Sequence, residues 1–170
     1  MRKIILASGS PRRKELLEQL GLPFTIEPGD YEEDMTLQMP PAELAETLAT
    51  GKAEAVAIMH DDAIVIGADT FVELDGAVLG KPHTKEKAEV MLKTLSGKTH
   101  QVHTGYCIID TKTGMIHSGT KTAKVTFRNL SQEEIDSYIV TYNPLDKAGA
   151  YAIQDGGKAF ISHIEGATMQ

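Results

Sequence analysis

The 170-residue sequence has no tryptophan, few other aromatic residues and a single cysteine, Cys107. One cysteine excludes a disulfide within the chain, and its place in the apolar run 106–109 indicates a buried thiol in a reducing compartment. Acidic residues outnumber basic ones by 24 to 17, and the resulting net charge of -7 repels nucleic acid. Four phenylalanines and no tryptophan also give nucleic-acid bases little to stack on. These shortages disfavour a disulfide scaffold and a nucleic-acid-binding protein.

Long apolar runs are missing as well. None approaches the roughly 20 residues of a membrane span, and the apolar segment near the N-terminus is too brief for a signal peptide. We find no repeats, no low-complexity tract and no linker rich in proline, glycine and serine. With 41% hydrophobic residues, the chain is expected to form one cytoplasmic domain over residues 1–170, without a membrane partner.

The chain is organised around its first segment. An apolar run over residues 4–7 predicts a strand, and Ser10 with Pro11 predicts a helix start, with Ser10 as the N-cap. The first turn of this helix holds the basic residues 12–14, although a cation near a helix N-terminus costs ~0.3–1 kcal/mol. This placement favours a bound phosphate, which backbone N–H groups, hydroxyls and guanidiniums would hold together. The alternative is a capped helix with a solvated basic face.

A second candidate site follows the apolar run 63–68. This run predicts a central strand buried on both faces, and it leads into Asp69 and Thr70. Open α/β sheets bind ligands at the carboxyl ends of such strands, although an aspartate that only opens a turn is equally common. The helix predicted from Pro41 to about Met59 carries Lys52 on its apolar stripe. Lys52 therefore points toward the core or a cleft, or it extends along the surface.

Two further features, one beside Lys52 and one earlier in the chain, bear on ligand binding. Gly51 thins the helix surface beside it, which would let a ligand approach closely. The loop 28–34 holds several carboxylates, among them Glu32 and Glu33. Such a cluster is usually a solvated turn, but hard cations also prefer carboxylate oxygens.

The rest of the chain alternates between strand and helix patterns, which is typical of the α/β class. Asp75-Gly76 predicts a β-hairpin turn, and helices are expected at 84–95 and 131–142. Further strands are predicted at 99–109, 115–128 and 159–164. The loop 146–154, with small residues around one lysine and one amide, is either a backbone-lined loop over a ligand or an ordinary connection.

Two motifs are excluded. The segment 97–99 is similar to the end of a P-loop, but that motif requires a glycine where this chain has Leu92. His100 and His103 suggest a metal pair, yet an offset of three on a predicted strand places them on opposite faces. Neither segment therefore predicts a nucleotide-binding or metal-binding function.

Several short segments, in this order along nearly the whole chain, resemble those of the Maf family of nucleoside triphosphate pyrophosphatases. They are Ser8–Arg13, Glu32-Glu33, Lys52, Gly67–Thr70, Gly80–Pro82, Ser96–His100 and Asp146–Tyr151. The resemblance implies the ITPase-like (Maf/Ham1) architecture, an α/β fold whose twisted mixed sheet has flanking helices and two lobes around a cleft.

The resemblance also implies an activity. A nucleoside triphosphate would be hydrolysed between its α and β phosphates with a divalent cation, Mg²⁺ or Mn²⁺. Asp69 matches the proposed proton acceptor, and Glu33 with Asp69 would hold the metal. The remaining matches are polar and basic groups around the phosphates: the catalytic Lys52 and Lys81, and the substrate-binding Ser8, Ser10, Arg12 and Arg13. Phosphoryl chemistry needs such positioning and charge neutralisation.

Within the family, Arg12, Thr70 and Gln154 match the branch that prefers dTTP and UTP. The Gln154 amide has the paired donor and acceptor that a pyrimidine edge requires. The chain departs from the family at Ala152, where glycine is usual, and it lacks the usual Gly-Leu-Pro segment and terminal helix. The resemblance implies removal of normal or modified pyrimidine nucleotides from the nucleotide pool.

The alternative function is a nucleotide-binding regulator of septum formation that acts through partner contacts. Release of pyrophosphate distinguishes an enzyme from such a regulator. The oligomeric state, including a homodimer, stays open at this stage.

Overall fold

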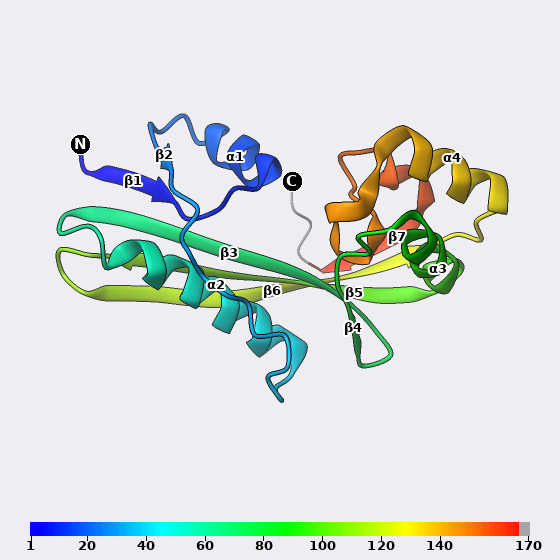
Figure 1. Cartoon of the computed structure of the whole chain (residues 1–170), viewed down its shortest axis with the longest axis horizontal. Coiled ribbons are helices and arrows are strands. Elements are labelled where there is room, and N and C mark those ends of the chain that lie inside the picture. Colours follow the sequence, from blue (N-terminus) through cyan, green and yellow to red (C-terminus); the bar gives the residue numbers. More distant parts are fainter. Residues whose placement is uncertain (167–170) are drawn as a thin grey trace. The chain divides into compact units, whose positions relative to one another are not determined.

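The computed structural model describes residues 1–166 and divides the chain into two compact units (Figure 1). The first unit contains residues 1–69 and 104–121, and the second contains residues 70–103 and the chain from 122 onward. Strands β3, β5 and β6 each contribute residues to both units. In the described chain the strands are β1 Lys3–Leu6, β2 Thr25–Ile26, β3 Ala63–Leu74, β4 Ala77–Leu79, β5 Thr99–Asp110, β6 Met115–Phe127 and β7 Ile161–Gly166. The α-helices are α1 Pro11–Glu18, α2 Pro41–Ala57, α3 Lys85–Leu95 and α4 Gln132–Tyr142.

The strands form one seven-stranded mixed sheet in the order β2-β1-β3-β5-β6-β7, with β4 paired to β3. The pairs β1–β2 and β1–β3 are parallel, whereas β3–β4 and β6–β7 are antiparallel. This architecture confirms the predicted mixed α/β class. Within residues 1–166, no helix has the length and apolar character needed to cross a membrane.

Asp69 does not end its strand as expected, because β3 continues to Leu74. The parallel neighbour β1 is the strand that stops: its last residue, Leu6, pairs with Ile66. Asp69 therefore lies on β3 just beyond the carboxyl end of β1. The sequence pattern correctly placed Asp69 near the carboxyl end of a strand. That strand end belongs to β1, however, and not to β3 as predicted.

Helix α2 packs against the sheet of the first unit through small residues (Figure 1). Ala45, Ala49 and Ala53 are fully buried. A Cβ added at Gly67 would overlap the carbonyl oxygen of Ala49, and one added at Gly105 would overlap that of Ala45. The helix backbone thus approaches β3 and β5 more closely than any larger residue would permit. The helix ends at Ala57, so Met59, expected on its apolar stripe, is exposed.

The predicted hairpin is present in the second unit. Leu74 pairs with Ala77, and both turn residues, Asp75 and Gly76, have positive φ values of 51° and 84°. Two positive φ values are typical of a type I′ turn, which matches the twist of the flanking strands. The core of this unit lies between α3, α4 and the sheet, and includes Leu92, Phe127 and Ile135.

The two excluded histidines have different partners in the second unit. His100 Nε2 lies 2.7 Å from the Tyr151 hydroxyl, whereas His103 Nε2 lies 2.6 Å from Glu73 Oε2. Burial lowers the pKa of His100 to about 4, so this side chain is neutral at pH 7. Both side chains act as hydrogen-bonded groups of the interior.

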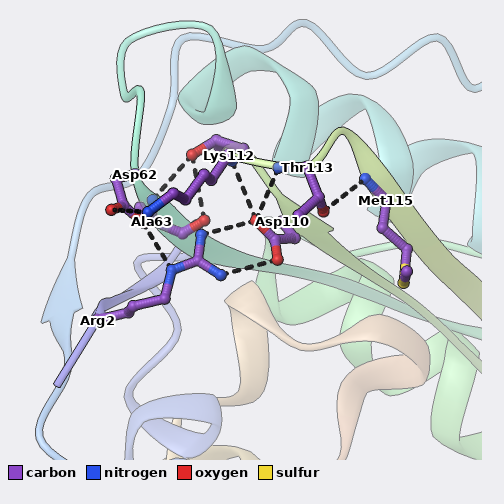
Figure 2. A network of polar contacts seen from close by, with 8 residues as sticks. Arg2, Asp62, Ala63, Asp110, Lys112, Thr113 and Met115 are labelled. Carbon is purple, nitrogen blue, oxygen red and sulfur yellow. Dashed lines mark hydrogen bonds and ion pairs between the residues drawn. The ribbon is translucent and has the colours of Figure 1, made fainter.

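Figure 2 shows a polar network around Arg2, at the start of β1 in the first unit. Arg2 makes a bidentate contact with Asp110, with N–O distances of 2.8 and 2.6 Å, and its Nε lies 2.6 Å from Asp62. Hydrogen bonds from Arg2 hold the pKa of Asp110 well below its usual range. The network ties the start of β1 to the start of β3 and the end of β5.

We expect Gly105→Ala to destabilise the protein by about 1–3 kcal/mol, because the added methyl group separates α2 from β5. Urea unfolding measures the change. Gly80→Ala is the matched control, since a Cβ there meets open space and should change stability by less than about 0.5 kcal/mol. Equal stability of the two variants would contradict the packing argument.

Candidate functional site

The candidate site of the first unit begins in the turn between β1 and α1. Ser8 is buried, and its Oγ accepts hydrogen bonds from the Ser10 backbone N–H at 3.2 Å and from Arg13 Nη1 at 3.1 Å. Ser10 occupies the N-cap position, but its side chain makes no capping hydrogen bond, contrary to the sequence prediction. The hydroxyl of Ser8 orders the turn instead, because it is buried where two donors meet.

Arg13 is directed from α1 toward β3. Its Nη2 lies 3.7 Å from Asp69 Oδ1, and its side chain is 22% exposed. Burial lowers the pKa of Arg13 while Asp69 opposes this shift, and the guanidinium stays charged at neutral pH. Arg12, the neighbouring residue, is only half-buried at the start of the same helix. The N-terminus of α1 thus carries two guanidiniums, one of them held beside a carboxylate.

Lys52 reaches the same carboxylate from α2. Its Nζ lies 3.2 Å from Asp69 Oδ1 and 2.6 Å from Glu33 Oε1, and its side chain is 17% exposed. Lys52 therefore points inward, and the alternative of a side chain extended along the surface does not apply. In the first unit, Asp69 Oδ1 thus contacts the cations of both Arg13 and Lys52, and Lys52 also contacts Glu33.

The space beside Gly51 is already occupied. A Cβ added there would overlap the ring of Tyr31, so the glycine makes room for a side chain of the protein itself. The close approach of a ligand beside Lys52 stays a prediction. Desolvation and the nearby carboxylates, Glu33 first among them, raise the pKa of Tyr31. Sequence reasoning missed Tyr31, although its place two residues before Glu33 was a usable signal.

Three of the predicted residues belong to the second unit: Thr70, Lys81 and Gln154. Lys81 and Gln154 are exposed. The segment around Lys81 is fixed to the loop 144–150, since Gly149 N–H donates to the Gly80 carbonyl at 3.2 Å. Lys147, in the loop 146–154, lies 2.9 Å from Asp155, next to Gln154. The roles of these three residues stay predictions.

The first unit offers a donor set that fits a hard divalent cation. Glu33 and Asp69 both contact the single ammonium group of Lys52, so their carboxylates surround a common position. Among residues 1–166, no group of three or more His, Cys, Asp or Glu side chains is arranged for metal binding. Mg²⁺ commonly uses one or two carboxylates and completes its shell with water and substrate phosphates, so two suffice.

The fold and the sequence have counterparts among known proteins. A solved structure of the Staphylococcus aureus Ham1 protein matches 95% of this chain and 92% of its own with a TM-score of 0.56 and 18% identity, which shows a shared fold. A family model described as Maf-like protein matches residues 3–170. The chain belongs to the Maf family.

Relatives within this family are much more similar. A protein of Bacillus anthracis named dTTP/UTP pyrophosphatase is 51% identical over 167 residues, which cover 98% of this chain and 86% of the relative. A protein of Bacillus mycoides with the same name is 50% identical over the same extent.

We expect Arg13→Ala to weaken binding of inorganic tripolyphosphate at least ~10-fold, because one charge-assisted hydrogen bond contributes about 1.5–3 kcal/mol. Isothermal titration calorimetry measures this affinity. Lys14→Ala is the matched control, because Lys14 is exposed on the same helix and paired with Glu18 at 3.6 Å. Equal weakening in both variants would indicate a general charge effect and not a site.

Proposed function

We propose that this protein is a nucleoside triphosphate pyrophosphatase that hydrolyses dTTP and UTP to the monophosphate and pyrophosphate, and so removes normal or modified pyrimidine nucleotides from the pool. The observation that carries the proposal is Asp69, a buried carboxylate that two cations contact from separate helices. The names of relatives that are 50–51% identical support the substrate and the reaction. Because those names describe an enzyme, a regulator acting only through partner contacts is not favoured.

The first unit supplies groups for each requirement of the reaction. Arg12, Arg13 and the N-terminus of α1 would bind phosphate oxygens and fix the orientation of the triphosphate. Asp69 would orient a water molecule and accept its proton as the water oxygen forms a bond to the α phosphorus. The bond to the bridging oxygen between the α and β phosphates then breaks, and pyrophosphate leaves. Lys52, already beside Asp69, would neutralise charge that develops on the phosphate oxygens.

Glu33 and Asp69 would hold the divalent cation. When bound, such an ion neutralises phosphate charge and orients the triphosphate. Lys52, which pairs with both carboxylates in the structure, would neutralise charge on the phosphate oxygens beside them. Lys81 is proposed as a further phosphate ligand, and Thr70 and Gln154 as residues that select the base. These three assignments rest on the match to the family motifs.

We expect Asp69→Asn to lower turnover by ~10²- to 10⁴-fold while nucleotide still binds, because the amide keeps the shape of the side chain but accepts no proton. Pyrophosphate release gives the rate, and calorimetry with a non-hydrolysable dTTP analogue gives the affinity. Asp61→Asn, at an exposed position before β3, should keep full activity. If Asp69→Asn retained more than a tenth of the wild-type rate, Asp69 would not be the base.

The expected selectivity among nucleotides follows from the proposal that Thr70 and Gln154 select the base. We expect kcat/KM for dTTP and UTP to exceed that for ATP, GTP and 7-methyl-GTP by at least ~10²-fold, since a site that hydrogen-bonds the correct base discriminates strongly against a base that leaves its amide unpaired. The thymine methyl should change kcat/KM by about 1 kcal/mol at most. One preparation assayed with each nucleotide decides the matter. A purine in first place would contradict the assignment, and release of no pyrophosphate from any nucleotide would contradict the proposed function.

A further inference from the structure

In the second unit, the segment that carries Lys81 is fixed at two points to the loop that follows α4. The backbone N–H of His83 donates a hydrogen bond to the Leu145 carbonyl oxygen at 3.0 Å. The backbone N–H of Gly149 donates one to the Gly80 carbonyl oxygen at 3.2 Å. The two bonds flank the lysine, so its backbone is held to this loop on both sides.

Lys147 lies midway between the two loop residues that make these bonds. Its Nζ lies 2.9 Å from Asp155 Oδ2, and only 15% of its side chain is exposed. A second carboxylate, that of Asp146, lies at 3.7 Å and is 80% exposed. Burial removes much of the water around the ammonium group, and the close ion pair with Asp155 offsets that cost. Asp155 directly follows Gln154, so one loop holds both the segment of Lys81 and the neighbour of Gln154.

Backbone conformation at this loop is unusual for the residues involved. His83 and Ala150 have positive φ values of 63° and 62°, although neither is a glycine. Such conformations persist only where the surrounding structure imposes them, and they cluster at ligand sites. His83 makes one of the two hydrogen bonds, and Ala150 follows the residue that makes the other. The strained positions thus coincide with the attachment of the Lys81 segment.

The turn that carries Gln154 also has backbone hydrogen bonds of its own. The N–H groups of Asp155 and Gly157 both donate to the Ala152 carbonyl oxygen, at 3.2 and 2.9 Å. These bonds lie within the turn and set its shape. The ion pair of Lys147 adds a different contact, which joins the turn to the loop that follows α4.

We propose that Lys147 is a positioning residue which, through Asp155, holds Gln154 at a set separation from Lys81 and so determines selectivity for the base. The proposal rests on the proposed function, in which Lys81 binds a phosphate and Gln154 selects the base. A nucleotide held by its phosphates presents its base to the amide only where this separation is kept. Loss of the ion pair should therefore impair recognition of the base and not binding of phosphate.

Two single variants with opposite changes in charge test the ion pair. Lys147→Met removes the positive charge but keeps an unbranched side chain, and Asp155→Asn removes the negative charge. We expect each variant to lower the ratio of the affinities for dTTP and ATP ~10-fold, because small displacements of positioned groups are costly. Calorimetry with non-hydrolysable analogues measures both affinities. The affinity for inorganic tripolyphosphate should stay within about threefold of wild type, and a pure charge effect would act in opposite directions in the two variants.

A double variant and a matched control complete the experiment. Because the two side chains act as a unit, Lys147→Met combined with Asp155→Asn should lower the ratio no further than either change alone. Lys158→Met, at an exposed lysine of the same unit, should leave the ratio unchanged. Asp155 is 39% exposed, so water can solvate its carboxylate when Lys147 is replaced. If Lys147→Met nevertheless does not fold, Asp155→Asn decides the matter.

Several outcomes would overturn the positioning role. These are an unchanged ratio in Asp155→Asn, opposite changes in the two single variants, an equal loss in Lys158→Met, and an equal weakening of tripolyphosphate binding. A wild-type protein that does not prefer the dTTP analogue would overturn it as well. The proposed function fails separately, if the wild-type protein prefers this analogue but releases no pyrophosphate from any nucleotide. The affinities do not depend on turnover, so they decide the role of Lys147 in that case too.

Discussion

The close approach of α2 to the strands of the first unit is the constraint on which the candidate site depends. Gly67 and Gly105 lack side chains where the carbonyl oxygens of Ala49 and Ala45 lie, so the helix backbone rests on the sheet. At this short distance a lysine side chain extends from α2 to a carboxylate on β3, and the Nζ of Lys52 lies 3.2 Å from Asp69. A larger residue at either glycine would move the helix outward and lengthen this contact.

The burial of Asp69 matters for the charges of the site as much as its direct contacts do. Asp69 is 6% exposed, and an ionised carboxylate so removed from water requires nearby cations or hydrogen-bond donors. Arg13 and Lys52 supply them from two different helices, and Ser8 holds the guanidinium of Arg13 through a hydrogen bond. A triphosphate brings its own negative charge to these cations. The same groups that stabilise Asp69 in the structure would therefore serve the proposed substrate.

The basic first turn of α1 is also explained by groups of opposite charge beside it. Cations at a helix N-terminus are unfavourable, and α1 has no buried residue with which packing would offset that cost. Arg13 recovers part of it through Ser8 and Asp69. Binding of an anion would offset more of this free-energy cost. The basic first turn therefore suits ligand binding better than it suits stability. The buried packing of the unit lies instead in its core, which includes Ala53 and Val56 of α2.

The sequence by itself determined the α/β class, the hairpin at Asp75-Gly76 and most element positions, because periodicity and turn residues act locally. It also placed Lys52 on the apolar stripe of its helix, but it left open whether the side chain points inward, and the contacts with Glu33 and Asp69 decided that. The tertiary structure alone decided which strand ends beside Asp69, because only pairing shows that β1 stops at Leu6, opposite Ile66, while β3 continues. It alone brought Tyr31 to Gly51 and distinguished Glu33 from Glu32. Those contacts join a loop to a helix about 20 residues away, and no local pattern encodes the face on which an irregular segment docks.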